Sequence, residues 1–252
     1  MTRDTQIYGL IGYPLLHSYS TDYFNNKFAS EGIDACYLNF ELEDVYQLME
    51  LIAEHPKLNG LNVTAPYKEA VMPLLDELDD DARAIGAVNV IKFVRDTNGE
   101  LLHLRGYNTD MNGFGHTMEP LLRPGMDKAL VLGTGGAAKA VRYALERLGV
   151  TVQLVSRHKS AQTVVYRELT KSMVADHHLV VNATPLGKFP RVDECPDFPF
   201  RFLGPKHLAY DLIYNPEETL FMRRAQEYGS QVKNGLEMLL LQAFASYEIW
   251  NS

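Results

Sequence analysis

Short apolar runs alternate with apolar residues at helical spacing along the first third of the chain. The predicted elements here are strands at 7–11, 36–40 and 61–64, and helices that start near Thr21 and Asp44. This alternation is typical of parallel strands joined by crossover helices. Further apolar runs at 88–94 and 100–104 flank Asn98 and Gly99. Since that pair favours a two-residue hairpin turn, antiparallel strands are predicted to complete a mixed sheet.

A second alternating pattern follows residues 108–110, where a helical stretch leads into a buried strand. The predicted elements are strands at 128–132, 150–155 and 163–166, and helices at 137–148 and 235–250. Too few residues precede the strand at 163–166 for a full crossover helix, so one helix of the usual alternation is predicted to be shortened or missing. Residues 189–205 contain four prolines and are predicted to form a surface loop.

Gly133, Gly135 and Ala138 stand where the strand at 128–132 turns into a helix. They occupy the small-residue positions of the pattern G-x-G-x-x-G/A. Missing side chains there permit a tight turn, a close approach of the backbone to a pyrophosphate, and close helix packing. The N–H groups at the helix start then face the phosphate. This context predicts a dinucleotide site, the alternative being glycines that serve turn geometry alone.

The end of the strand at 150–155 indicates which dinucleotide is bound. An NAD-binding protein usually places Asp or Glu there, on the ribose hydroxyls, but this chain has Ser156, Arg157 and His158. A carboxylate would repel a 2′-phosphate, whereas the Arg157 guanidinium can donate to it and stack on adenine. NADP is therefore predicted over NAD, with Lys159 as a further positive charge. The alternative is an ordinary solvated basic turn.

The composition excludes several classes of protein. The 252 residues include 24 basic and 32 acidic ones, and the formal charge of -8 gives no basic field for nucleic acid or an anionic membrane. Cys36 and Cys195 stand far apart without metal-type spacing, so neither a disulfide framework nor a metal site is predicted. No apolar run is typical of a signal peptide or a membrane span, and we expect a cytoplasmic protein.

Several separated motifs together resemble the shikimate dehydrogenase family over nearly the whole length. The motifs besides the glycine turn are GYPLLHSYS at 12–20, NVTAPYK at 62–68, GAVN at 86–89, NTD at 108–110, NATPLG at 182–187, YDLIY at 210–214, and GLEML at 235–239 followed by Gln242. Their number and order make a chance match implausible.

The resemblance implies an α/β fold with an N-terminal mixed-sheet substrate domain, a Rossmann-like NADP-binding domain and a C-terminal helix that returns to the first domain. The implied bounds are 1–107 plus 236–252 for the substrate domain and 108–235 for the NADP domain. Members of this family reversibly reduce 3-dehydroshikimate to shikimate with NADPH, a step toward chorismate and the aromatic amino acids. The implied partners are small molecules, and the implied assembly is a monomer or homodimer.

By the same resemblance, Lys68 is the general acid for ketone reduction and the base in the reverse direction. Asp110 is expected beside Lys68, holding its ammonium and hydrogen-bonding the substrate hydroxyl. Each residue alone has an ordinary alternative, since Lys68 could lie on the surface at a helix start and Asp110 could be an N-cap.

Ser18 and Ser20 match a serine pair that donates to the substrate carboxylate. Two residues apart in an extended segment, their hydroxyls would point to the same side. The alternative is a serine-rich turn with one serine as a helix cap. Further substrate positions are implied for Thr64, Asn89, Tyr214 and Gln242. Each of these four could instead be a buried polar residue that satisfies backbone groups.

The cofactor positions implied by the family comprise the glycine turn, the basic strand end and two residues near the nicotinamide. They are Gly133, Thr134, Gly135, Gly136, Ala137, Ser156, Arg157, His158, Leu212 and Gly235. Many relatives carry Asn-Arg-Thr where this chain has Ser-Arg-His, so the guanidinium is retained while its neighbours differ. Gly235 could equally be a turn residue that opens the last helix.

Two alternative functions stay open. A dehydrogenase of the same family could use quinate or an amino-substituted analogue, since one hydroxyl or amine changes few contacts. Quinate-using relatives often replace the second serine with threonine, so Ser20 with Arg157 favours shikimate and NADP. A non-catalytic NADP or metabolite sensor would be expected to lose Lys68, Asp110 or the serine pair, and all are present.

Overall fold

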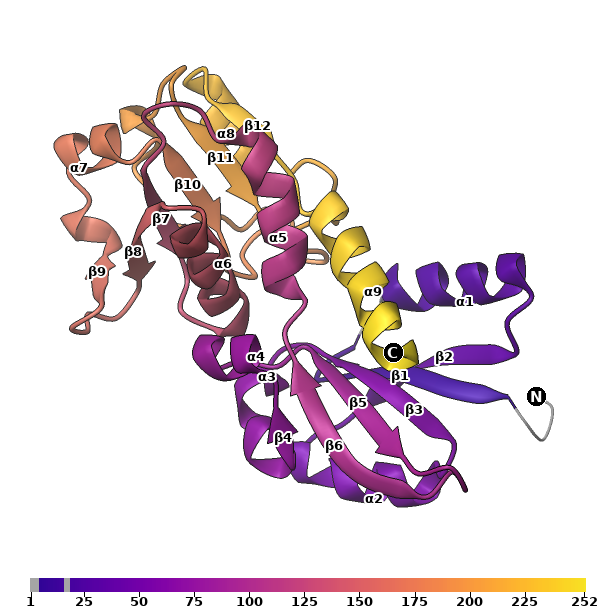
Figure 1. The fold of residues 1–252 in the computed structure, drawn as a ribbon. Coiled ribbons are helices and arrows are strands. Elements are labelled where there is room, and N and C mark those ends of the chain that lie inside the picture. Colours follow the sequence, from indigo (N-terminus) through magenta and orange to yellow (C-terminus); the bar gives the residue numbers. More distant parts are fainter. Residues whose placement is uncertain (1–4, 16–18) are drawn as a thin grey trace. The chain divides into compact units, whose positions relative to one another are not determined.

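The computed structural model describes residues 5–15 and 19–252, which form two compact units (Figure 1). The first unit comprises residues 1–109 and 243–252, and the second comprises residues 110–242. The chain therefore passes between the units at Thr109 and again within its last helix. Each unit is built around its own six-stranded sheet, which gives the chain the predicted α/β class.

The first unit contains a mixed sheet in the order β2-β1-β3-β5-β6-β4. Its elements are β1 Gln6–Gly12, α1 Tyr19–Glu31, β2 Ala35–Glu41, a 3₁₀ helix Val45–Gln47, α2 Leu48–Glu54, β3 Leu58–Val63, α3 Tyr67–Ala70, a 3₁₀ helix Met72–Leu74, β4 Glu77–Leu78, α4 Asp80–Ile85, β5 Val90–Arg95 and β6 Leu101–Tyr107. β1 pairs in parallel with β2 and β3, whereas β5 pairs antiparallel with β3 and β6. The predicted mixed sheet is confirmed.

The turn between β5 and β6 differs from the predicted two-residue hairpin. Gly99 has φ +87° and donates its N–H to the carbonyl of Asp96 at 3.0 Å, while no non-glycine residue of the described chain has positive φ. The turn therefore spans 97–99, with glycine in the left-handed position, as in three-residue hairpins. The Asp96 carboxylate accepts from the backbone N–H groups of Asn98 at 2.8 Å and Glu100 at 2.9 Å. These bonds favour the wider turn over one that needs Asn98 at positive φ.

An aromatic cluster packs in the core of the first unit and includes the end of α9, Leu236–Asn251. Trp250 stacks on Tyr8 with ring centroids 4.9 Å apart, and its indole N–H donates to the carbonyl of Ile91 at 3.1 Å. A side chain at Gly60 would overlap the Trp250 ring. The C-terminal helix thus returns to the first unit, as expected.

The second unit contains a wholly parallel sheet in the order β12-β11-β10-β7-β8-β9. Its elements are α5 Asp110–Met118, a 3₁₀ helix Glu119–Leu121, β7 Lys128–Leu132, α6 Gly136–Arg147, β8 Thr151–Ser156, β9 Thr163–Val165, a 3₁₀ helix Tyr166–Glu168, α7 Lys171–Asp176, β10 Leu179–Asn182, a 3₁₀ helix Phe200–Phe202, β11 Leu208–Asp211, α8 Leu220–Glu227, β12 Gln231–Lys233 and the start of α9. If β7 is numbered as strand 1 and the sheet is read from β9 to β12, the strand order is 3-2-1-4-5-6, as in a Rossmann fold.

The two faces of this parallel sheet are covered by different helices. Ala129 and Val131 of β7 pack in a core with α5 and α6, whereas Leu130 and Leu132 pack in a second core with α7 and α8. Residues 189–205 contribute Phe198, Phe200 and Leu203 to that second core. The proline-rich loop is therefore ordered and partly buried. A strand covered on both faces explains the unbroken apolar run of β7.

The predicted missing crossover helix is confirmed between β8 and β9. The two strands are parallel, and no helix lies in the connecting residues 157–162, all of which are described. The connection is possible because β9 pairs only with Leu154, Val155 and Ser156 at the end of β8, so the chain has little distance to retrace. This leaves the end of β8 bordered by a tight turn.

Within the described part of the chain, no helix has both the length and the apolar character needed to cross a membrane.

Candidate active site

The glycine turn between β7 and α6 has the backbone geometry that a dinucleotide site requires. Gly133 has φ +117°, and its N–H donates to the carbonyl of Val155 at 2.8 Å. A Cβ at this position would lie 3.1 Å from the carbonyl oxygen of Ala183, which follows β10. Both the conformation and the close approach therefore favour glycine at position 133.

The start of α6 is suited to an anion. Gly135 is the N-cap, with no side-chain cap hydrogen bond, and the first turn of α6 contains no acidic residue. Thr134 and Gly135 are exposed, and a Cβ at Gly135 would meet nothing within 4 Å. The N-terminal end of a helix carries partial positive charge and unpaired N–H donors. These residues fit the pyrophosphate of a dinucleotide.

The glycine turn also lies at the point where the strand order of the sheet reverses. β7 pairs with β8 on one side and with β10 on the other. In an open parallel sheet, ligands bind beyond the carboxyl ends of the strands at such a switch point. Gly133 follows β7 there, and the segment Ala183–Gly187 follows β10. The position in the sheet agrees with the predicted cofactor site.

Ser156 is the last residue of β8, and the chain bends directly after it at Arg157 and His158. The Ser156 hydroxyl accepts from the N–H of His158 at 3.2 Å, and the Thr163 hydroxyl donates to the His158 carbonyl at 3.1 Å. The side chains of Arg157 and His158 are exposed. No carboxylate of the described residues forms an ion pair with Arg157. The turn is thus held through its backbone, which leaves a guanidinium and an imidazole in solvent.

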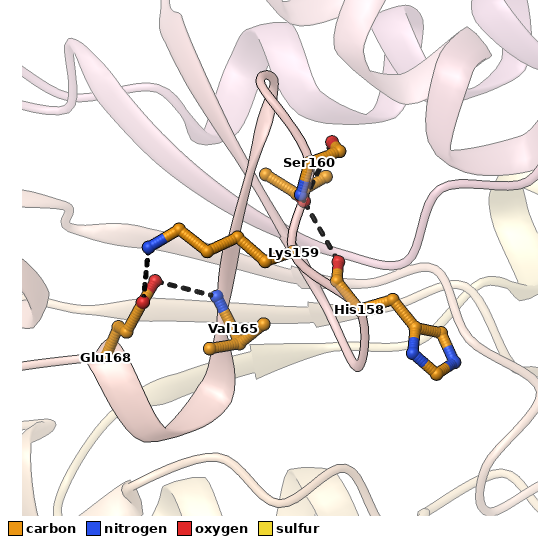
Figure 2. Close-up of polar contacts among 6 residues, drawn as sticks. His158, Lys159, Ser160, Val165 and Glu168 are labelled. Atoms are coloured by element: carbon orange, nitrogen blue, oxygen red, sulfur yellow. Dashed lines mark hydrogen bonds and ion pairs between the residues drawn. The ribbon is translucent and has the colours of Figure 1, made fainter.

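Lys159 takes a different direction from its neighbour His158 (Figure 2). Its ammonium donates to Glu168 at 2.6 Å, and Glu168 also accepts from the N–H of Val165 at 3.3 Å. The hydrogen bond from Lys159 lowers the pKa of Glu168. Because a carboxylate already neutralises Lys159, this geometry gives no support to the added phosphate charge proposed from the sequence. Arg157, with His158 beside it, stays the residue predicted to contact the 2′-phosphate.

Leu212 and Gly235, the predicted nicotinamide neighbours, are packed against each other. The N–H of Leu212 donates to the Asn182 carbonyl at 3.0 Å, and that of Gly235 donates to the Ile213 carbonyl at 3.1 Å. A Cβ at Gly235 would overlap the carbonyl oxygen of Leu212. The two backbone segments approach so closely that only glycine fits at position 235.

Three sequence motifs of the first unit come together at the carboxyl end of β3. The backbone carbonyl of Lys68 accepts from the N–H of Val88 at 2.7 Å, and the Asn89 carbonyl accepts from the N–H of Val63 at 2.8 Å. Thr64 follows β3 directly, and its N–H donates to the Ile11 carbonyl at 2.9 Å. Thr64, Lys68 and Asn89 are therefore carried by one hydrogen-bonded framework. Lys68 and Thr64 are partly exposed, and Asn89 is buried.

A buried polar network supports Asn89. Its side-chain oxygen accepts from the N–H of Thr109 at 2.7 Å, and its side-chain amide donates to the Thr109 hydroxyl at 3.0 Å. Asn62 donates to the hydroxyl of Ser246 at 3.0 Å and accepts from that of Tyr37 at 2.8 Å. The sequence interpretation missed these supports. Asn62 and Thr109 lie inside recognised motifs, but nothing in the spacing shows that they pair with residues far along the chain.

The structure corrects the expectation for the serine pair. Ser20 is buried in the first turn of α1, so it does not lie in an extended segment. The hydroxyl of the next residue, Thr21, donates to the side-chain oxygen of Asn39 at 2.9 Å. Once the backbone is helical, alternation of side chains no longer applies. Ser18 lies outside the described residues.

The remaining predicted residues belong to the second unit. Asp110 is the first residue of α5 and is buried, and Gln242 is buried in α9. Gln242 packs against Gly113 of α5: a Cβ at Gly113 would lie 3.1 Å from the backbone nitrogen of Gln242. Tyr214 is half-buried, and burial raises its pKa. The roles of these residues in binding and catalysis stay predictions.

Among residues 5–15 and 19–252, no cluster of histidine, cysteine or acidic side chains has a metal-binding arrangement. The two cysteines are free, and burial raises the pKa of the Cys195 thiol to about 11.

The fold and the glycine turn define a class, the two-domain dehydrogenases that combine a mixed-sheet unit with a Rossmann-like nicotinamide-dinucleotide domain. Residues 10–91 match the family model for the shikimate dehydrogenase substrate binding domain. The chain belongs to the shikimate dehydrogenase family.

Relatives of this chain include both proteins and solved structures. The NADP(+) shikimate dehydrogenase of Desulforamulus reducens is 40% identical over 98% of this chain and 90% of its own length. A structure of the Thermus thermophilus enzyme in complex with NADP(H) and shikimate has a TM-score of 0.82, with 29% identity over 97% of this chain and 93% of that one. A quinate dehydrogenase from Corynebacterium glutamicum in complex with NAD has a TM-score of 0.83, with 30% identity over 98% of this chain and 94% of that one.

Proposed function

We propose that this chain catalyses the reversible NADPH-dependent reduction of 3-dehydroshikimate to shikimate, the step toward chorismate and the aromatic amino acids implied by its family. The observation that carries the proposal is 40% identity, over nearly the full length, to an NADP(+) shikimate dehydrogenase. The parallel sheet with its glycine turn at the switch point supports the cofactor class.

The glycine turn holds the cofactor pyrophosphate in this proposal, and Arg157 with His158 holds the 2′-phosphate. Gly133 and Gly135 leave the backbone accessible, and the start of α6 supplies N–H donors and positive potential. Arg157 can donate two parallel hydrogen bonds to a phosphate because its guanidinium is a planar fork. When bound, NADPH supplies the hydride.

Lys68 donates a proton to the ketone oxygen and takes it back in the reverse reaction. Its backbone is anchored to Val88, so its side chain projects from a fixed point at the start of α3. Asp110 orients the Lys68 ammonium and accepts from a substrate hydroxyl. A general acid needs to stand within hydrogen-bond reach of the developing alkoxide.

Polar side chains hold the polyhydroxylated ring in this proposal. Ser18 and Ser20 donate to its carboxylate, whereas hydroxyl and amide groups elsewhere bind the ring hydroxyls. The latter groups belong to Thr64, Asn89, Tyr214 and Gln242. The buried position of Asn89 and its bonds to Thr109 support a rigid placement of its amide.

An absorbance assay for reduced nicotinamide tests the proposal. Shikimate and quinate are each supplied with NADP and with NAD, and we expect rapid turnover only of shikimate with NADP. Turnover with quinate or NAD would keep the fold and the proposed dyad but overturn the specificity. No turnover in any combination would favour a sensor that binds NADP without chemistry.

A lysine variant tests the mechanism. Lys68→Ala should lower kcat by several orders of magnitude, since general acid catalysis alone contributes about 10² to 10⁴-fold. The affinity for NADPH, measured by fluorescence titration, should remain nearly unchanged. Lys57→Ala, at a lysine just before β3, is the matched control and should leave both quantities unchanged. Equal losses of affinity and turnover in Lys68→Ala would indicate a structural role.

Quinate oxidation is the second candidate function. It is favoured by the similarity to a quinate dehydrogenase that was crystallised with NAD. The quinate and NAD arms of the same assay test it directly.

A further inference from the structure

The second unit buries an acidic side chain for which the proposed mechanism has no use. Asp211 is the last residue of β11 and is fully buried. Its Oδ1 accepts from the side-chain amide of Asn182 at 3.1 Å and from the N–H of Ile213 at 3.0 Å. Its Oδ2 accepts from the hydroxyl of Thr219 at 2.6 Å. Every contact of this carboxylate is thus an acceptor contact.

The partners of Asp211 connect it to the segment after β10. Asn182 is the last residue of β10, and its side-chain oxygen accepts from both the N–H and the hydroxyl of Thr184, at 3.1 and 2.7 Å. The Thr184 hydroxyl in turn accepts from the N–H of Leu186 at 3.3 Å. One chain of hydrogen bonds therefore runs from Asp211 into the segment that flanks the glycine turn.

The same carboxylate fixes the segment after β11. By accepting from the N–H of Ile213 it sets the peptide whose carbonyl faces Gly235. The Ile213 carbonyl accepts from the Gly235 N–H at 3.1 Å. Thr219, which donates to Asp211, also caps α8 by accepting from the N–H of Met222 at 3.2 Å. Both ends of the segment 212–219 are thus held by Asp211.

A neutral side chain of similar size could fill this position at a smaller desolvation cost than a carboxylate. Burial raises the pKa of Asp211 to about 6, so the group is mainly ionised at neutral pH. Within the described chain, no lysine, arginine or histidine forms an ion pair with it. A buried carboxylate without an ion-pair partner is unfavourable to stability, which points to a requirement for three accepted hydrogen bonds.

We propose that Asp211 is a positioning residue for the cofactor, which couples the segments after β10 and β11 and so fixes Leu212 and Gly235 for the nicotinamide. This inference rests on the proposed function, because the nicotinamide position is implied by the family. Asp211 acts on the backbone and does not itself touch the reacting atoms. Its removal should therefore disturb hydride geometry more than cofactor affinity.

Four variants separate positioning from general structure. Asp211→Ala removes every acceptor, whereas Asp211→Asn keeps one oxygen. Thr219→Val removes one donor at nearly constant volume, and Thr219→Ser restores it. The readouts are kcat, the KM for shikimate, the NADPH dissociation constant by fluorescence, and hydrogen exchange of the free protein.

Asp211→Ala should lower kcat by about 10²-fold, since misplacement of reactants by about 1 Å has an effect of that size. The NADPH dissociation constant should change less than about threefold, because the glycine turn and Arg157, which are proposed to bind the cofactor phosphates, lie outside the segments after β10 and β11. Hydrogen exchange should accelerate in the segments 183–187 and 212–219 and stay unchanged in 133–139. Thr219→Val should reproduce part of these effects, and Thr219→Ser should reverse them.

The two proposals can fail separately. A wild-type protein that turns over shikimate, with Asp211→Ala equally active or with unaltered exchange in both segments, would overturn the positioning role. Equal losses of kcat, NADPH affinity and shikimate KM would also overturn it, in favour of general destabilisation. A wild-type protein without turnover or NADPH binding would overturn the proposed function, whatever the exchange data show.

Discussion

Replacing Asp211 by asparagine should make the protein respond differently to pH. Burial raises the pKa of this carboxyl from 3.8 to about 6 in the folded protein. A shift of one pKa unit corresponds to about 1.4 kcal/mol. The free energy of unfolding is therefore about 3 kcal/mol higher when Asp211 is protonated in both the folded and the unfolded state than when it is ionised in both. This contribution is fully present below the unfolded pKa and is lost as the pH rises through the folded pKa. Asp211→Asn cannot titrate and should lack this loss.

The assay is urea unfolding followed by circular dichroism at several pH values. From about pH 4.5 to 7.5, the free energy of unfolding of the wild type should fall by about 2 kcal/mol relative to that of Asp211→Asn. A constant offset caused by the substitution itself cancels in this comparison. Trp250, the only tryptophan, reports the first unit by fluorescence in the same samples.

A matched control uses an aspartate with the opposite shift. The exposed Asp176 has its pKa lowered by the hydrogen bond from Lys128, so its contribution is present at neutral pH and is lost on acidification. Because its pKa lies below 3.8 in the folded protein, the difference between wild type and Asp176→Asn should stay nearly constant over the pH range of the assay. A difference for Asp211→Asn that is independent of pH, as for the control, or that rises with pH, would refute the reasoning.

Four further substitutions test other parts of the molecule. Arg157→Ala should weaken NADP binding at least about tenfold in calorimetry and leave NAD nearly unchanged, as expected for a lost charged hydrogen bond. Lys159→Ala, at an ammonium already 2.6 Å from a carboxylate, should change neither affinity by more than about twofold, and equal effects of the two variants would contradict the phosphate assignment. Gly235→Ala would place a methyl group against the carbonyl oxygen of Leu212. It should lower the free energy of unfolding by about 1–3 kcal/mol in thermal unfolding, and an unaltered Tm would contradict the close approach of the two segments. Tyr37→Phe removes a hydroxyl that donates at 2.8 Å to a buried amide, and should lower the free energy of urea unfolding by about 1–2 kcal/mol; a neutral effect would mean that the amide finds another partner.

The local elements were predictable where one strong pattern dominated. The buried strand, glycine turn and amphipathic helix around Gly133 follow from apolar spacing and the conformations open to glycine. The short connection after Ser156 was also predictable, because chain length limits what can fold between two strands. Local patterns failed at the hairpin after β5 and at Ser20. The Asp96 carboxylate selects a wider hairpin, and a helix rather than an extended segment carries Ser20.

The supporting contacts of the site could not be predicted from spacing. The sequence predicts Lys159 as a second charge for the phosphate, yet its partner Glu168 lies nine positions further along and is brought close by the turn. Asp211 and Asn182 lie in recognised motifs, but their pairing depends on the adjacent places of β10 and β11 in the sheet. Long-range pairing of this kind is a property of the tertiary fold, which single-sequence patterns do not encode.

The division of α9 between the two units has a consequence for how the protein is made. The first unit appears first during synthesis, yet its aromatic cluster includes Trp250, which is translated after the entire second unit. Until then, Gly60 and the ring of Tyr8 lack the indole that packs on them. The unit that is translated first is therefore completed last, by residues 243–252, so it cannot form its full core until synthesis has ended.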